Sequence, residues 1–172
     1  VDAFRYFLIA EMTLGQDATF TEEAFVRRYN ADLANDLGNI LSRVLKLVAG
    51  YCDGKIPAAA VSGDDERHLR DVALSAADRM VASVGEMRID LGVAELAGVV
   101  REANRYLEKR QPWTLAKQGQ QEELATVLYT AAETLRVVSG MLYPVMPGKM
   151  SELRQALGLP AGEPEYATLK QW

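Results

Sequence analysis

The sequence is poor in the side chains that carry most enzyme chemistry. It has one cysteine, Cys52, and one histidine, His68, among 172 residues. A single cysteine excludes an intrachain disulfide, and this cysteine and histidine do not have the spacing of zinc ligands. His68 stands among Asp64, Asp65 and Asp71, so we interpret it as a surface residue rather than a general base. Because P-loop and Gly-x-Gly-x-x-Gly motifs are also missing, we expect no catalytic residues and no metal in this chain.

Long apolar runs are missing as well. No run approaches the roughly 18 residues of a membrane span, and no basic start leads into an apolar core as in a signal peptide. Lys and Arg number 19 against 24 Asp and Glu, which gives a formal net charge of −5. This balance argues against a general nucleic-acid coat, whereas local recognition depends on where the charges lie. We expect a cytoplasmic protein without a membrane or DNA partner.

Apolar residues recur at helical spacing along most of the chain, and no alternating strand pattern is present. The length fits one domain with a sizeable core. The spacing predicts main helices over 1–14, 21–49, 64–88, 91–110 and 122–142, and a short one over 151–156. We therefore expect an all-α fold, a helical bundle of about five main helices plus a short C-terminal helix.

The expected helix boundaries rest on a few residues. Thr21 and Asp90 are suited to begin helices, because their side-chain oxygens can accept from free backbone N–H groups. Pro112 should end or sharply kink the helix before it. The tail after 156, with Pro160 and Pro164, has loop composition.

The most unusual stretch runs from Arg28 to Arg43. Its apolar residues recur at steps of three and four and form one buried helical face. On the other face, Asn35, Asn39 and Arg43 fall at four-residue steps and form a polar ridge. Asparagine is a poor helix former, so these amides need a reason. Either they tie neighbouring helices together, or the amides and the guanidinium read the edge of a base.

A second polar constellation surrounds Trp113. Arg101, Arg105 and Lys109 form a basic stripe at four-residue steps, and Arg110 adds a charge close to Pro112-Trp113. A tryptophan fixed by a preceding proline is a platform for an unpaired base, and such stacking is worth about 1–3 kcal/mol per base. The alternative is that Trp113 belongs to the core and that the stripe is a solvated helix face. Spacing alone does not separate these interpretations.

The stretch Arg28-Tyr-Asn-Ala-Asp-Leu-Ala-Asn-Asp-Leu-Gly-Asn39, followed by Ser42-Arg43, closely resembles the opening of a known domain. It is similar to the anticodon-binding domain of the methionyl-tRNA synthetase family. The resemblance covers nearly the whole chain and includes the segments Val1–Leu8, Gly15–Asp17, Ala103–Tyr106, Gln111–Lys117 and Tyr143–Pro147.

The resemblance implies which residues bind RNA. In the family, the Trp of the Pro-Trp pair stacks on a splayed anticodon base, and an Asn and an Arg hydrogen-bond the anticodon, chiefly its wobble cytosine. The residues at these positions are Asn39, Arg43, Pro112 and Trp113. The expected partner is the CAU anticodon loop of methionine tRNA, with RNA backbone contacts from Arg105, Lys109 and Arg110. The resemblance also requires Trp113 to lie beside Asn39 and Arg43, which leaves Asn35 to tie helices within the bundle.

The family's catalytic machinery is missing from this chain. Its nucleotide-binding fold, HIGH-type motif and zinc knuckle are absent, and Lys149-Met-Ser-Glu-Leu153 departs from the KMSKS loop at the glutamate. We interpret this segment as a helix start following Pro147. The cofactors of the parent enzyme, ATP with Mg²⁺, would bind the absent catalytic domain. Whether that domain also holds Zn²⁺ is left open.

The chain begins with Val in a helical pattern, so we expect it to be part of a longer protein. Residues 1–20 would be a connecting helix and linker from an absent catalytic domain, and residues 21–172 the anticodon-binding bundle. The parent enzyme would ligate methionine to tRNA with ATP, and this part would be inactive alone. The alternative is a helical protein-interaction domain without an RNA-binding role, whose expected partner is the catalytic domain.

Overall fold

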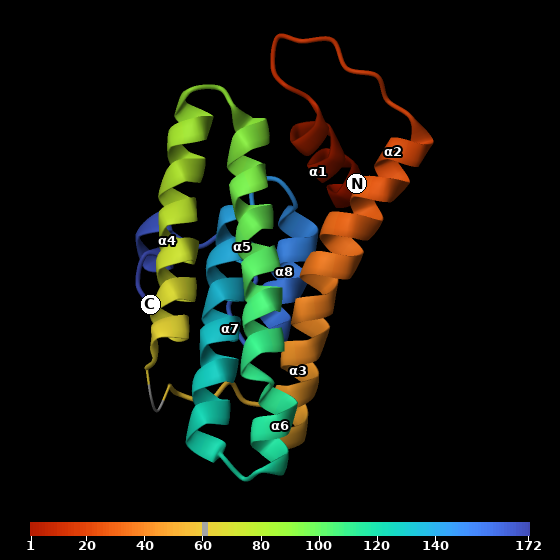
Figure 1. Ribbon diagram of the computed structural model, residues 1–172. Coiled ribbons are helices and arrows are strands. Elements are labelled where there is room, and N and C mark those ends of the chain that lie inside the picture. The colour runs from red at the N-terminus through yellow and green to blue at the C-terminus, as the bar shows by residue number, and fades with distance from the viewer. Residues whose placement is uncertain (60–61) are drawn as a thin grey trace.

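The computed structural model describes residues 1–59 and 62–172, and this part of the chain contains helices and no strand (Figure 1). The expected all-α fold is therefore confirmed. The segments are α1 (Asp2–Glu11), α2 (Glu22–Arg28), the π-helical η1 (Tyr29–Gly38), α3 (Asn39–Tyr51), α4 (Asp64–Gly85), α5 (Ile89–Arg110), α6 (Pro112–Lys117), α7 (Gln121–Met141), α8 (Pro147–Ala156) and α9 (Tyr166–Leu169).

The core lies where α4, α5 and α7 run alongside one another, with α3 beside α5 (Figure 1). Leu69 of α4, Leu96 of α5, Leu128 of α7 and Val44 of α3 are completely buried. Burying a side chain of this size contributes about 1.5–3 kcal/mol. Because fourteen of its 21 residues are buried, α7 is the central helix that the others surround.

The long helix expected over 21–49 is present as α2, η1 and α3, which follow one another without a break. Thr21 caps it as predicted, because its Oγ1 accepts from the N–H of Ala24 at 3.1 Å. The π-helical segment η1 was not predicted. Its wider turn brings Gly38 close to the residue five positions earlier, and a Cβ at Gly38 would lie 3.0 Å from the carbonyl oxygen of Leu33.

The first helix is shorter than predicted and ends at Glu11, because Met12 is extended, with φ −101° and ψ 121°. Its first turns are fixed to the corner between α7 and α8. The Nε of Arg5 donates to the carbonyl oxygen of Val145 at 3.0 Å. The N–H of Lys149 donates to Oδ2 of Asp2 at 2.7 Å. A carboxylate of α1 thus accepts from a free backbone N–H in the first turn of α8, where negative charge is favourable.

Asp90 does not cap α5 as predicted. The residue before the helix is Arg88, and Asp90 lies inside the first turn. Its carboxylate accepts from Nη2 of Arg88 at 3.2 Å and from Oγ1 of Thr13 at 3.1 Å. The Arg88 hydrogen bond is the main reason that the pKa of Asp90 is lowered. Asp90 thereby ties the connector after α1 to the start of α5.

The C-terminal region is more helical than the sequence suggested. Helix α8 starts at Pro147 rather than at Ser151. Lys149–Leu153, the segment that resembles a KMSKS loop, therefore lies at the start of a helix, as predicted. The unpredicted α9 lies against the bundle, with Leu169 buried. Its first residue and the residue after it are bonded to Asp78 of α4, which accepts from the hydroxyl of Tyr166 at 2.8 Å and from Nζ of Lys170 at 2.5 Å.

Candidate functional site

The structure brings Arg43 and Trp113 together. Arg43 projects from α3, and its guanidinium carbon lies over the indole of Trp113 at 5.1 Å from the ring centroid. A cation placed over tryptophan at this distance gains about 0.5–2 kcal/mol. The requirement that Trp113 lie beside the Asn39–Arg43 ridge is therefore met.

The turn between α5 and α6 sets the position of Trp113 (Figure 1). Helix α5 ends at Arg110 because Gln111 adopts the left-handed conformation, with φ 44° and ψ 61°. Pro112 then starts α6, at a helix position where no backbone donor is needed. The predicted helix end at Pro112 is confirmed, whereas α6 itself was not predicted.

Trp113 is half-buried and does not belong to the core. Pro112 is buried, and Leu115 and Ala116 of α6 pack against the core, but among the described residues Trp113 is not one of the side chains that do so. Its ring instead contacts Arg43 at the surface. Trp113 thus lies half-buried beside Arg43, and its role as a platform for an unpaired base stays a prediction.

Asn39 is exposed, and a second asparagine holds its amide. Nδ2 of Asn39 lies 3.3 Å from Oδ1 of Asn104 on α5. Nδ2 of Asn104 donates to the carbonyl oxygens of Asp36 and Val100, both at 3.1 Å. Asn104 thus joins α5 to the η1–α3 helix and fixes the direction of the Asn39 side chain. The sequence did carry a signal for this helix tie, because asparagine is unfavourable in the middle of a helix and Asn104 lies there.

Asn35 is exposed, and within the described residues no hydrogen bond joins its side chain to another helix, so the tie expected of it is not observed. It lies within η1, whereas Asn39 and Arg43 lie on α3. The helix tie that we assigned to Asn35 belongs to Asn104.

The cations of this surface are paired with acidic side chains. Nη2 of Arg43 lies 2.8 Å from Oε1 of Glu108. On the basic stripe, Arg101 pairs with Asp36, Arg105 with Glu102 and Lys109 with Asp65. Exposed pairs of this kind contribute about 0–1 kcal/mol each, so an incoming phosphate can replace the carboxylates at little cost. The stripe is a set of exchangeable pairs rather than a strongly positive patch.

Arg110 differs from the rest of the stripe because its partner is buried. Its Nη1 lies 3.2 Å from Oε1 of Glu66, a residue that is only 5% exposed. The same carboxylate accepts from the hydroxyl of Tyr106 at 2.8 Å and from the N–H of Gly63 at 2.9 Å. The pKa of Tyr106 is raised, mainly by burial and secondly by its hydrogen bond to Glu66. Arg110 therefore compensates a buried charge, and its contact with RNA stays a prediction.

His68 lies at a groove of about 380 Å³ between α4 and α5, which Arg105 and Lys109 also line. Its side chain is 64% exposed, and its Nε2 lies 3.5 Å from Glu102, so the interpretation of His68 as a surface residue is confirmed. Within residues 1–59 and 62–172, no group of three His, Cys, Asp or Glu side chains could hold a metal ion. In the same ranges, none of the helices combines the length and apolar character of a membrane span.

Comparison with known families decides what this fold is. Residues 56–168 match the model of the anticodon binding domain of methionyl tRNA ligase. The chain belongs to this family. Residues 1–45 match a second model, that of class I tRNA synthetases (M). The class I match ends at residue 45 and the anticodon-binding match begins at residue 56, and the division expected at residue 20 stays a prediction.

Relatives of this anticodon-binding domain are parts of longer proteins. The methionine–tRNA ligase of Deinococcus radiodurans is 45% identical over 173 residues, which are 100% of this chain and 25% of that protein. The ligase of Streptomyces coelicolor is 38% identical over 98% of this chain and 32% of its own length. The free-state crystal structure of Mycobacterium tuberculosis methionyl-tRNA synthetase superposes with a TM-score of 0.94 at 31% identity, over 99% of this chain and 35% of that one. The chain thus spans about a quarter to a third of these relatives.

Proposed function

We propose that this anticodon-binding domain recognises the CAU anticodon of methionine tRNA through Asn39, Arg43 and Trp113. The observation that carries the proposal is the placement of Arg43 over the Trp113 ring, with Asn39 one turn away on α3. A stacking surface and hydrogen-bonding side chains thereby share one accessible site. Recognition of unpaired RNA bases uses this combination, because splayed bases stack on aromatic rings and are read on their edges.

Each side chain has a separate chemical role in this proposal. Trp113 supplies the flat apolar face, and stacking contributes about 1–3 kcal/mol per base. Arg43 supplies N–H donors for the O2 and N3 acceptors of a cytosine, and the Asn39 amide offers both a donor and an acceptor. Pro112 fixes the start of α6 and so positions the indole. Arg105 and Lys109, which are 71% and 68% exposed, would exchange their carboxylates for phosphates.

We further propose that the longer protein is a methionine–tRNA ligase, which uses ATP with Mg²⁺ to attach methionine to its tRNA. The curated relatives carry this name. This part would hold the anticodon and orient the acceptor end towards the catalytic domain, which is the expected second partner. The domain alone would not form methionyl adenylate.

The test is binding of an anticodon stem-loop that carries CAU, compared with one whose wobble base is changed. We expect Trp113→Ala and Arg43→Ala each to weaken binding of the CAU loop by about 1–3 kcal/mol. Arg70→Ala is the matched control, because Arg70 is a half-buried arginine of α4 that, like Arg43, pairs with an acidic side chain, that of its neighbour Asp71. Equal affinity of the unsubstituted protein for the two loops would overturn the assignment.

The second candidate function is docking of a protein by apolar surface. It is favoured by exposed apolar side chains at the α1–α2 end of the molecule, where Phe4, Leu14 and Phe20 are 44%, 62% and 54% exposed. Added salt distinguishes the two functions, because RNA binding weakens steeply with salt and apolar docking much less. The surfaces also lie at opposite ends of the molecule, with α6 far from α1 (Figure 1).

A further inference from the structure

A single buried carboxylate joins the first turn of α4 to the last turn of α5. Glu66 of α4 is only 5% exposed. Its Oε1 accepts from the hydroxyl of Tyr106 at 2.8 Å and lies 3.2 Å from Nη1 of Arg110. Its Oε2 accepts from the N–H of Gly63 at 2.9 Å. Tyr106 and Arg110 are one turn apart on α5, so one group holds two residues of the turn that ends this helix.

A neutral amide of the same shape does not reproduce these contacts. In Glu66→Gln, one of the two oxygens is replaced by an NH₂ group, which only donates. In one orientation this group faces the N–H of Gly63, and in the other it faces the donors of Arg110 and Tyr106. A buried donor that faces another donor loses its hydrogen bond. Both oxygens of Glu66 are therefore needed to fasten α5 to α4.

The fastened turn leads directly into the ring that we propose stacks on a base. Gln111 stands between Arg110 and Pro112 in the left-handed conformation, with φ 44°. A residue with a side chain keeps this unfavourable conformation only where contacts fix the chain around it. On the α6 side, Pro112 is buried, and the carbonyl oxygen of Gln111 accepts from the N–H of Thr114 at 2.8 Å. On the α5 side, Arg110 is paired with Glu66.

The start of α4, the end of α5 and α6 lie at the same end of the molecule (Figure 1). Because Glu66 is buried there, it does not itself contact RNA. Its partner Arg110 is only three residues before Trp113, and the intervening Gln111 and Pro112 have restricted backbones. A movement of Arg110 is therefore transmitted to the indole.

We propose that Glu66 is a positioning residue for Trp113. It anchors the last turn of α5 through Tyr106 and Arg110, which keeps Gln111 left-handed and places the indole beside the guanidinium of Arg43. The effect on anticodon affinity rests on the proposed function, whereas the effect on the orientation of Trp113 does not depend on RNA.

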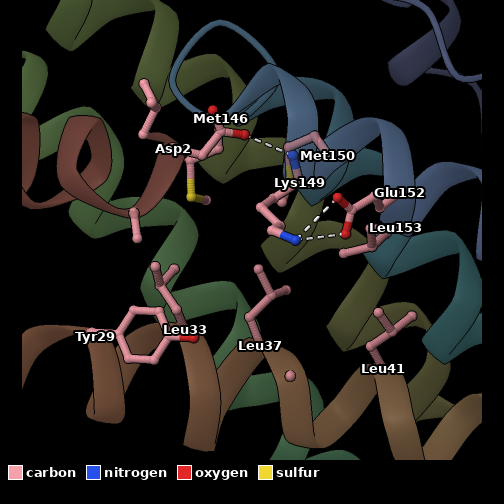
Figure 2. Close-up of a pocket in the computed structure, with 13 residues that line it drawn as sticks. Asp2, Tyr29, Leu33, Leu37, Leu41, Met146, Lys149, Met150, Glu152 and Leu153 are labelled. Atoms are coloured by element: carbon pink, nitrogen blue, oxygen red, sulfur yellow. Dashed lines mark hydrogen bonds and ion pairs between the residues drawn. The ribbon is translucent and has the colours of Figure 1, made fainter.

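The test compares Glu66→Gln with the matched variant Asp32→Asn. Asp32 has the same kinds of partner, because it accepts from the hydroxyl of Tyr6 at 2.9 Å and lies 3.4 Å from Nη1 of Arg28. It precedes Leu33, which lines the apolar groove between η1 and α8 (Figure 2). Helix α1, which carries Tyr6, is far from α6 (Figure 1). Both variants replace one carboxylate by an amide, so they change the net charge equally.

The first measurement is fluorine NMR of the protein labelled with fluorotryptophan, in which the Trp113 signal is the one missing from Trp113→Phe. We expect this signal to shift or broaden in Glu66→Gln and to stay in place in Asp32→Asn. The second measurement is binding of the CAU stem-loop, which should weaken about 3- to 10-fold in Glu66→Gln because the stacking ring is displaced. Removal of a carboxylate by itself favours binding of a polyanion, so the expected loss has the opposite sign to the effect of charge.

Gly63→Ala is a second variant that leaves the charge unchanged. Its Cβ would lie 2.6 Å from Oε2 of Glu66 and displace the carboxylate, so the Trp113 signal should change here too. If Glu66→Gln does not fold, the same measurements on Gly63→Ala decide.

An unchanged Trp113 signal in folded Glu66→Gln, or an equal change in Asp32→Asn, would overturn the proposal. Undiminished binding of the CAU loop by Glu66→Gln would overturn it as well, provided that Trp113→Ala binds more weakly. If Trp113→Ala binds the loop as well as the unsubstituted protein does, the proposed function is wrong, and the fluorine signal still decides the role of Glu66.

Discussion

Asn104 holds Asn39 in place across two helices. Oδ1 of Asn104 lies 3.3 Å from Nδ2 of Asn39, while Nδ2 of Asn104 is occupied by the carbonyl oxygens of Asp36 and Val100. The donors of Asn104 thus point into the bundle, and its acceptor points towards the exposed amide. A residue without an expected RNA contact therefore determines how a proposed reader is presented.

Asn104→Ala is expected to lower both stability and anticodon affinity. Loss of the helix tie should cost about 1 kcal/mol of unfolding free energy, because two backbone carbonyls lose a donor. The CAU stem-loop should bind more weakly, since Asn39 loses its fixed direction. Denaturant unfolding and stem-loop titration measure the two effects. Asn35→Ala, at an exposed asparagine of η1, is the control, and an equal loss of affinity in both variants would contradict the positioning role.

Tyr106→Phe should lower stability at neutral pH and flatten its alkaline dependence. The variant removes a hydrogen bond to buried Glu66, at a cost of about 1–2 kcal/mol. Because the pKa of Tyr106 is raised in the folded protein, its contribution is complete below pH about 10 and is lost as pH rises through the folded value. Unfolding free energies measured across this range should fall less steeply in the variant. Tyr6 and Tyr166, whose pKa values are also raised, keep part of the slope, so an unchanged slope would count against Tyr106.

Lys109→Ala is expected to weaken RNA binding about equally for every loop sequence. Lys109 is exposed and pairs with Asp65, so it can contact a phosphate but does not lie at the Arg43–Trp113 pair. The slope of log affinity against log salt should fall by about one. Arg70→Ala, on the same bundle, should leave the slope unchanged. A selective effect on the CAU loop would show that Lys109 reads a base rather than the backbone.

Gly140→Ala and Gly98→Ala should move stability in opposite directions. A Cβ at Gly140 of α7 would clash with both Cδ atoms of Leu169 and lie 3.0 Å from Cγ of Pro164, so side chains of the C-terminal segment must shift. Overpacking of this kind costs about 1–3 kcal/mol. At Gly98 of α5 a Cβ meets nothing within 4 Å, and alanine should stabilise the helix by up to about 1 kcal/mol. Thermal unfolding, monitored by circular dichroism, compares the two variants. Equal stability would contradict the close packing of Leu169 of α9 against Gly140.

Periodicity and boundary residues predicted the main helices well, because both act through neighbours in the sequence. Thr21 caps its helix and Pro112 ends one as expected. The failures arise where a partner distant in the sequence intervenes. Asp90 was expected to cap a helix, but in the folded chain Arg88 and Thr13 bind its carboxylate. Thr13 is 77 residues away from Asp90 and is therefore invisible to a local pattern.

The candidate site shows the same limit more sharply. Spacing placed Asn35, Asn39 and Arg43 on one line, which holds only in an unbroken α-helix. Asn35 lies in the π-helical η1, and Asn104, distant in sequence, makes the helix tie that was expected of Asn35. The nearness of Arg43 to Trp113 followed from a family resemblance, since no spacing rule relates residues on different helices.

The bond between Asp2 and Lys149 has a consequence for the order in which the protein is completed. It joins positions 147 residues apart, and Arg5 reaches the neighbouring corner over a similar separation. A ribosome releases α1 before the rest of this bundle, but the groups that fix α1 emerge only when most of the bundle has been made. We therefore expect α1 to dock late, after α4, α5 and α7 have formed their core, and this closing contact to be slow because its partners are so far apart along the chain.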